Sequence, residues 1–187
     1  MSSSLILRTK ESDYLLQIVT FFVFILQTIY RMKKILFVCH GNICRSPMAE
    51  FIMKYIAAGY GAMLHIESAA TSSEEIGNRV YPPAARELAV HGISCDGKRA
   101  RRITADDFSF YDMIIVMEDY NIGNMRTLPI RCGKVWKLLD FAGCVTEGVA
   151  TPLSGSDISD PWYHGDFAKT YREIESGCAG LMKYLGY

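Results

Sequence analysis

The chain has 187 residues, of which 50% are hydrophobic and 21% are charged, and its formal net charge at pH 7 is zero. A chain of this length and composition can bury one sizeable core, which excludes a disordered or fibrous protein and favours about one domain. The balanced charge gives no overall electrostatic basis for nucleic-acid binding, so any selectivity for anions must arise locally.

The first 31 residues differ from the rest of the chain. The segment from Tyr14 to Tyr30 is uncharged throughout, and lysines and arginines flank it on both sides. It is at the short end of the roughly 17 to 25 residues that a spanning helix needs. No small-residue cleavage site follows it, which argues against a removed secretory signal. The basic residues that follow it would keep the rest of the chain on the cytoplasmic side of a membrane.

Three interpretations of residues 1–31 stay open. The segment is a membrane anchor at the cytoplasmic face, a soluble extra helix, or an extension that results from the choice of start site. Met32 favours the last of these, because it opens the strand-like sequence MKKILFVCH. We therefore expect a functional domain at residues 32–187, a cytoplasmic location, and membrane contact through residues 14–30 only.

From residue 33 onwards, strand-like and helix-like segments alternate. Short apolar runs predict four strands, at residues 35–39, 63–69, 111–118 and 135–139. Helical spacing predicts three longer helices, at residues 47–58, 82–90 and 165–186. Two glycines, Gly177 and Gly180, predict a loosened stretch in the last helix. Strands joined by helices predict a three-layer α/β sandwich, in which a four-stranded parallel sheet has helices on both faces.

The strongest functional signal lies directly after the first predicted strand. The sequence CHGNICRS, residues 39–46, places a cysteine at the strand end and Arg45 just before a predicted helix. Ligands bind at the carboxyl ends of parallel strands, and loop amides beside a helix N-terminus form a cradle for anions. Gly41 and Asn42 tolerate the left-handed backbone that turns amides inward. The arginine offers a planar fork of donors that suits phosphate, and a thiol in such a positive environment ionises readily. The pattern predicts a phosphate-binding loop with a nucleophilic cysteine.

The stretch LFVCHGNICRSPMAE, residues 36–50, resembles the signature of the low-molecular-weight protein tyrosine phosphatases. The sequence SDPWY, residues 159–163, resembles the Asp-Pro acid loop of that family, and the likeness covers residues 32–187. The resemblance implies that Cys39 is the nucleophile, Arg45 the phosphate clamp and Asp160 the general acid. It also implies a loop-supporting role for Ser68. Substrate-binding roles are implied for His40, Gly41, Asn42, Ile43, Cys44, Ser46, Trp162 and Tyr163.

The implied activity is hydrolysis of phosphotyrosine through a phosphocysteine intermediate, with no cofactor. The expected partner is a phosphotyrosine-containing protein, such as a tyrosine kinase, and not a nucleic acid. The six cysteines show no paired C-x-x-C units and no zinc-like spacing, so we expect no metal site. They are typical of free thiols in a reducing compartment.

Other functions of the same fold stay open. An arsenate reductase needs a relay of further cysteines, and the segment from Tyr111 to Met117 contains none. A protein arginine phosphatase tends to carry threonine where this chain has Ile43. A phosphopeptide-binding module or a phosphocarrier would use the cysteine loop without hydrolysis, and the pair Asp160 and Pro161 argues against both.

Two further details affect the expected site. Asp157 is a rival for the role of general acid, and the stiff Pro161 favours Asp160 over it. The basic run KRARR, residues 98–102, is interpreted as a solvated face. Lys98 within it stands where many relatives carry a histidine that supports the loop asparagine.

Overall fold

The computed structural model describes residues 10–130, 133–143, 148 and 150–187, and within the first helix it describes side chains only for residues 13–23. The chain divides into two compact units, Met1–Met32 and Lys33–Tyr187. The first unit contains helix α1, Lys10–Arg31. Its described apolar side chains, among them Leu15, Ile18 and Phe22, are exposed.

The expected apolar segment at residues 14–30 lies within α1, and the side chains of residues 24–30 are outside the described set. In the part of the chain that the structure describes, no helix has the length and the apolar character needed to cross a membrane.

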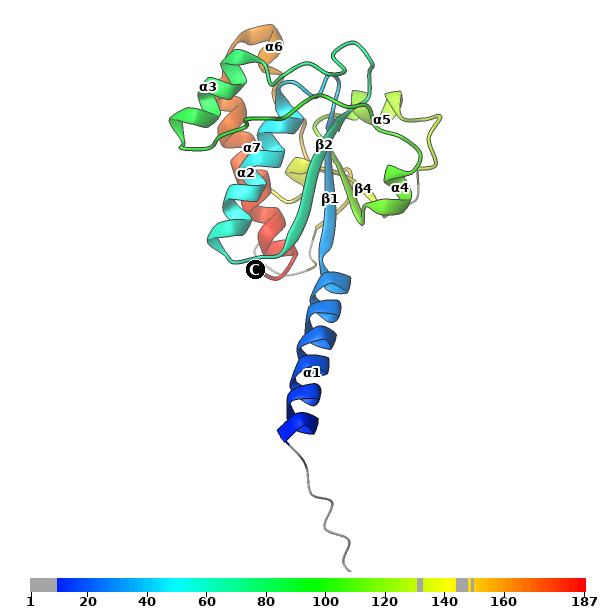
Figure 1. Ribbon diagram of the computed structural model, residues 1–187. Helices are drawn as coiled ribbons and strands as arrows, with labels where there is room; N and C mark the ends of the chain where they lie inside the picture. Colours follow the sequence, from blue (N-terminus) through cyan, green and yellow to red (C-terminus); the bar gives the residue numbers. More distant parts are fainter. Residues whose placement is uncertain (1–9, 131–132, 144–147, 149) are drawn as a thin grey trace, which may run out of the picture. The chain divides into compact units, whose positions relative to one another are not determined.

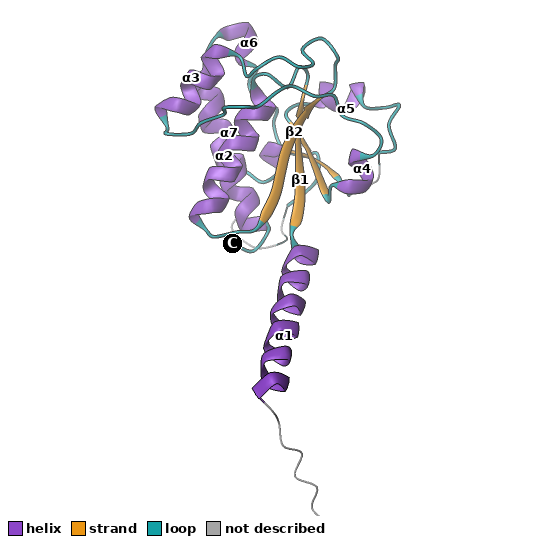
Figure 2. Ribbon diagram, in the orientation of Figure 1, coloured by secondary structure: helices purple, strands orange, loops and turns teal. Residues whose placement is uncertain are grey.

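The second unit is built on a four-stranded parallel sheet, as predicted (Figure 2). The strands lie in the order β2-β1-β3-β4. Their bounds are Leu64–Ala70 for β2, Lys33–Cys39 for β1, Met113–Val116 for β3 and Val135–Lys137 for β4. The last two are shorter than predicted. β4 gives way to a 3-10 helix, η1 (Leu138–Asp140), because the Asp140 carboxylate accepts the backbone N–H of Lys137 at 2.7 Å and turns the chain.

Helices cover both faces of the sheet, which confirms the three-layer α/β prediction (Figure 1). Two long helices pack together on one face, α2 (Arg45–Gly59) and α7 (Phe167–Tyr184), and α3 (Pro82–Val90) packs against both. The other face carries two short helices, α4 (Asp107–Phe110) and α5 (Asp119–Asn124), which the sequence patterns did not predict.

The strand side chains alternate between two hydrophobic cores. Ile35 and Phe37 of β1 point into the core beneath α2 and α7, whereas Leu36 and Val38 point into the core on the opposite face. All four are fully buried. Burial on both faces explains why the strands appear as unbroken apolar runs in the sequence, and it holds the carboxyl end of β1 rigidly.

The predicted loosening of the last helix is wrong. α7 continues without a break through Gly177 and Gly180. A Cβ atom at Gly177 would lie 2.6 Å from Cγ of Leu138, and one at Gly180 would overlap the carbonyl group of Phe141. These glycines therefore allow η1 and the residue after it to pack directly on the helix backbone.

This close packing gives a stability prediction. We expect Gly180→Ala to lower the free energy of unfolding by about 1–3 kcal/mol, because the added methyl group must displace backbone. The matched control is Gly123→Ala in α5, where an added Cβ meets no atom within 4 Å. Denaturant unfolding of the full chain should show no loss for the control, and equal stabilities of the two variants would contradict the packing role.

Candidate active site

Cys39 is the last residue of β1, at the carboxyl edge of the sheet, and it is 3% exposed. The loop after it leads directly into α2, whose first residue is Arg45. The backbone N–H of Asn42 donates to the Cys39 sulfur at 3.3 Å, and the Ser46 hydroxyl lies 3.0 Å from it. The sulfur therefore lies beside a backbone N–H and the N-terminus of α2, a position that favours an anionic group.

Asn42 holds the loop in shape. Its φ angle is +58°, in the left-handed region, whereas Gly41 has no positive φ, contrary to the expectation for that glycine. The Asn42 amide nitrogen donates to the hydroxyls of Ser46 at 2.8 Å and Ser68 at 2.7 Å. Its amide oxygen accepts the backbone N–H of Arg101 at 3.2 Å. The strained backbone of one residue is therefore fixed by three hydrogen bonds of its own side chain.

Ser68 is part of a buried network of hydrogen bonds and ion pairs. The Ser68 hydroxyl donates to the carboxylate of Glu50 at 2.6 Å, and Glu50 is 3% exposed. Lys98 and Lys54 each approach this carboxylate to 2.6 Å, and Lys98 also donates to the carbonyl of Ser68 at 3.1 Å. Lys98 therefore supports the loop through Glu50 and Ser68.

The basic run at residues 98–102 is only partly the solvated face that was expected. Lys98 points inward, and Arg101 forms ion pairs with Asp107 at 3.0 Å and Glu67 at 3.2 Å. Arg99 and Arg102 are exposed.

Arg45 lies between two carboxylates although it is only 3% exposed. Its Nη2 is 2.7 Å from Glu118 and 2.5 Å from Asp160. Burial of the guanidinium lowers the pKa of Arg45. The hydrogen bond to Glu118 and the nearby negative groups raise this pKa by more, so the net shift is upward. Glu118 was not identified from the sequence. The sequence feature that could have identified it is its position, two residues after a buried strand and at the same sheet edge as Cys39.

The acid segment enters the site through the short helix α6, Pro161–His164. Asp160 caps this helix, since its carboxylate accepts the backbone N–H of Trp162 at 3.1 Å. Asp157 is held elsewhere, because it pairs with the buried Lys137 at 2.9 Å and accepts the N–H of Asp119 at 3.3 Å. The geometry therefore supports Asp160 over its rival.

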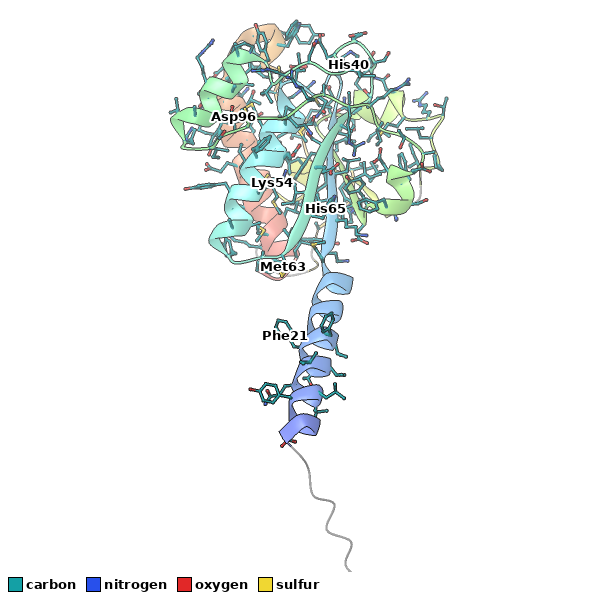
Figure 3. The ribbon with its side chains drawn as sticks, viewed as in Figure 1. Phe21, His40, Lys54, Met63, His65 and Asp96 are labelled. Carbon is teal, nitrogen blue, oxygen red and sulfur yellow. The ribbon has the colours of Figure 1, made fainter. Side chains whose placement is uncertain are left out.

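The cysteine loop and the acid segment enclose a pocket of about 620 Å³. His40, labelled in Figure 3, lies at its rim, where its Nε2 is 3.1 Å from Glu74. Trp162 is 55% exposed and Tyr163 is 85% exposed, and both line the pocket. The pocket is lined by Cys39, His40, Gly41, Ile43, Cys44, Arg45, Glu74, Glu75, Glu118, Tyr120, Asp160, Trp162 and Tyr163.

Three predicted site residues lie behind the pocket wall. Asn42, Ser46 and Ser68 are at most 1% exposed and support the loop from within. Glu74, Glu75, Glu118 and Tyr120 line the pocket but were not predicted to do so. All four lie outside the two motifs: Glu74 and Glu75 are in the loop after β2, Glu118 directly precedes α5, and Tyr120 is in α5.

Cys44 is a poor candidate for a second nucleophile. It is 6% exposed and packs with Ile43 and Ala100. Burial and the charge of Cys39 raise the pKa of Cys44 to about 12, so it stays a neutral thiol at physiological pH. In the described part of the chain, no group of three or more His, Cys, Asp or Glu side chains is arranged to hold a metal ion.

The buried ion pair predicts an asymmetry between two lysines. Lys98 is 11% exposed at its side chain and Lys54 is 43% exposed, although both lie 2.6 Å from Glu50. We expect Lys98→Met to lower the free energy of unfolding by about 3 kcal/mol, the lower end for a broken buried pair. Lys54→Met, the matched control, should cost less than about 1 kcal/mol.

Denaturant unfolding of both variants, and of Lys98→Met combined with Glu50→Gln, checks this prediction. The double variant should recover part of the loss, because no buried charge is then left unpaired. Equal losses for the two lysine variants would show that Lys98 acts only as a surface charge.

Comparison with known proteins places this chain in a family. Residues 34–187 match the family model described as low molecular weight phosphotyrosine protein phosphatase. The low molecular weight protein-tyrosine-phosphatase YfkJ of Bacillus subtilis is 35% identical over 155 residues, which cover 81% of this chain and 94% of the relative. The corresponding enzyme PtpA of Staphylococcus aureus is 32% identical over 157 residues, which cover 82% of this chain and 94% of PtpA.

Solved structures agree with these matches. The crystal structure of YfkJ superposes with a TM-score of 0.72 and covers 81% of this chain and 92% of that one. The crystal structure of the low molecular weight protein tyrosine phosphatase SP-PTP from Streptococcus pyogenes is 34% identical, with a TM-score of 0.69. It covers 83% of this chain and 95% of its own.

Proposed function

The chain belongs to the low-molecular-weight protein tyrosine phosphatase family, and on that premise we propose that it hydrolyses phosphotyrosine in proteins, without a metal ion, through a phosphocysteine formed on Cys39. One observation carries the residue assignment. The cysteine sulfur, the Arg45 guanidinium and the Asp160 carboxylate all line one pocket, although Asp160 is more than 100 residues away in the sequence.

In the first step, the Cys39 thiolate attacks phosphorus in line with the phenolic oxygen. The S–P bond forms as the P–O bond to the tyrosine breaks. Negative charge on the equatorial oxygens is stabilised by Arg45 and by the loop N–H groups at the N-terminus of α2. The phosphate takes the place of Asp160 on Arg45, and the freed carboxyl group, in its protonated form, donates its proton to the leaving phenolate.

In the second step, the ionised Asp160 accepts a proton from a water molecule, whose oxygen attacks phosphorus. The S–P bond breaks, inorganic phosphate leaves, and the thiolate of Cys39 is restored. The Ser46 hydroxyl, 3.0 Å from the sulfur, stabilises this thiolate as the leaving group.

The pocket geometry supports phosphotyrosine over other phosphorylated side chains. A phosphate at the buried sulfur is reached by the long tyrosine side chain, whereas phosphoserine would have to bring its backbone into the pocket. The ring would lie along Trp162 and Tyr163, and aromatic pairs of this kind contribute about 0.5–1.5 kcal/mol each. Ile43 lines the pocket with an apolar side chain, which suits a phenyl ring better than a charged guanidinium.

The other functions of this fold find less support. Of the cysteines that the structure describes, only Cys44 shares the loop with Cys39, and its raised pKa does not suit it for the thiolate relay of an arsenate reductase. A module that only binds phosphopeptides, or only carries phosphate, has no use for an acid held at the pocket by Arg45.

We propose a tyrosine kinase that carries phosphotyrosine as one class of protein substrate, and the cytoplasm as the place of action. Contact with a membrane surface through residues 14–30 is supported by the exposed apolar side chains of Leu15, Ile18 and Phe22. The proposed partner depends on the phosphotyrosine activity, whereas the proposed place of action does not.

The covalent mechanism predicts different effects for two variants. Cys39→Ser should abolish turnover but keep phosphate binding, because the loop amides and Arg45 remain, whereas Arg45→Ala should lose both. One measurement is phosphate release from phosphotyrosine, phosphoserine and phosphoarginine peptides in the presence of a metal chelator. The other is the binding of inorganic orthovanadate or phosphate to each variant. We expect release from phosphotyrosine, and substantial turnover by Cys39→Ser would rule out the phosphocysteine.

General acid catalysis predicts a dependence on the leaving group. Asp160→Asn should lower kcat/KM by about 100-fold or more for phenyl phosphate, which has a poor leaving group. The same variant should lower kcat/KM much less for p-nitrophenyl phosphate, which has a good one. Asp157→Asn is the matched control. It weakens the pair with Lys137 and should affect both substrates alike. Equal losses for both substrates in Asp160→Asn would remove Asp160 from the acid role.

A further inference from the structure

The mouth of the pocket carries more negative charge than the proposed reaction requires. Four carboxylates line the pocket, together with Arg45 and the imidazole of His40. Two of these carboxylates, Glu118 and Asp160, pair with Arg45. The other two belong to Glu74 and Glu75, in the loop that follows β2, and the mechanism uses neither of them.

Glu74 is held at the outer edge of the cysteine loop. Its side chain is 69% exposed, and its Oε2 lies 3.1 Å from Nε2 of His40. His40 directly follows the nucleophile in the chain, so the Glu74 carboxylate stands beside the entrance to the phosphate site. Exposure of both partners leaves this carboxylate accessible to a charged group on a substrate.

Glu75 lies closer to the loop backbone. A Cβ atom on Gly41 would come within 3.2 Å of its Cγ, so the Glu75 side chain packs closely on this glycine. Asn78 donates to its Oε2 at 2.6 Å and fixes the side chain. Glu75 and Cys44 both line the pocket, so the Glu75 carboxylate faces the same space as the cysteine loop.

Positive groups near these glutamates lie outside the pocket. Arg99 approaches the same loop, with its Nη1 3.5 Å from the carbonyl of Gly77, but neither Arg99 nor Arg79 lines the pocket. A bound phosphate dianion is balanced by Arg45 on the pocket floor. The residues before and after the phosphotyrosine must cross the mouth, where Glu74 and Glu75 dominate the charge.

We propose, on the basis of the proposed function, that Glu74 and Glu75 form an acidic rim that selects phosphotyrosine sites flanked by lysine or arginine over sites flanked by glutamate or aspartate. A flanking cation is attracted to the rim, and a flanking carboxylate is repelled. Exposed ion pairs change an equilibrium by about 2- to 5-fold each, so the effect on substrate choice is modest for one charge and larger for two. The chemistry at phosphorus is unchanged.

The test compares three short phosphotyrosine peptides that differ only in their neighbours, with Lys, Gln or Glu on both sides of the phosphotyrosine. For the full chain, kcat/KM should fall in the order Lys, Gln, Glu, with about 5- to 20-fold between the ends of the series, mostly through KM. The Lys/Glu ratio should fall towards one in about 0.5 M NaCl, because the interaction is exposed to solvent.

Substitution of the rim should remove the same preference. Glu74→Gln and Glu75→Gln should each reduce the Lys/Glu ratio by about 2- to 5-fold, and the double variant should bring it close to one. The matched control is Asp106→Asn, which removes an exposed negative charge just before α4, away from the pocket residues, and should leave the ratio unchanged. A uniform change in kcat for all three peptides would indicate a structural effect and would contradict the proposal.

Binding of the three peptides to Cys39→Ser, followed by fluorescence anisotropy, separates this inference from the proposed function. Suppose that the full chain hydrolyses the Gln peptide, but the Lys and Glu peptides have nearly equal kcat/KM and nearly equal affinity. The acidic rim is then refuted and the proposed function stands. If no peptide is hydrolysed, the function fails, and the binding ratio still decides whether the rim selects cationic neighbours.

Discussion

The ion pairs of Arg45 are the interaction on which the site depends. This guanidinium is 3% exposed, and a buried cation is costly unless opposite charges and acceptors surround it. Its partners come from two distant parts of the chain, Glu118 after β3 and Asp160 before α6. One side chain thereby joins the start of α2, the end of a neighbouring strand and the acid segment. We propose the same group as the phosphate clamp, so the residue that would bind the substrate also holds together the parts proposed for catalysis.

On the other side of the loop, a second buried charge is balanced in the same way. Glu50 receives the Ser68 hydroxyl and Lys98, and Ser68 in turn receives the amide of Asn42. Asn42 needs this support because its left-handed backbone costs energy that only surrounding contacts can offset. The loop amides are therefore fixed before any phosphate arrives, and the reaction does not have to reorganise them.

The sequence predicts the sheet and the cysteine loop well because both depend on local patterns. Residues 35–39 form an unbroken apolar run, and residues 39–46 place the thiol, glycine, asparagine and arginine in one short segment. The partners of those residues are not predictable in this way. Glu118 is a single carboxylate in a segment without a motif, and Glu50 ends the signature stretch with no pattern that shows its partner. Only the folded sheet and helix bring Glu118 to Arg45 and Glu50 to Ser68.

The errors in the sequence analysis have the same origin. Gly177 and Gly180 indicated a weak helix by propensity. In the structure they instead allow η1 and the residue after it, which are distant in the sequence, to pack against the helix backbone. Lys98 belongs to a basic run that is typical of a solvated face, yet a buried carboxylate draws it inward. In both cases, tertiary packing overrides a local preference that was correctly identified.

The residues proposed for catalysis and the residues proposed for substrate selectivity lie on different parts of the chain. The proposed nucleophile, clamp and loop support, Cys39, Arg45 and Ser68, lie on β1, α2 and β2, and all three are buried. Glu74 and Glu75 lie on a loop, where substitution costs little stability. The walls Trp162 and Tyr163 are likewise exposed. A phosphatase built in this way can change which phosphotyrosine it prefers through a few surface residues, while the buried ion pairs that hold the nucleophile and the acid stay the same.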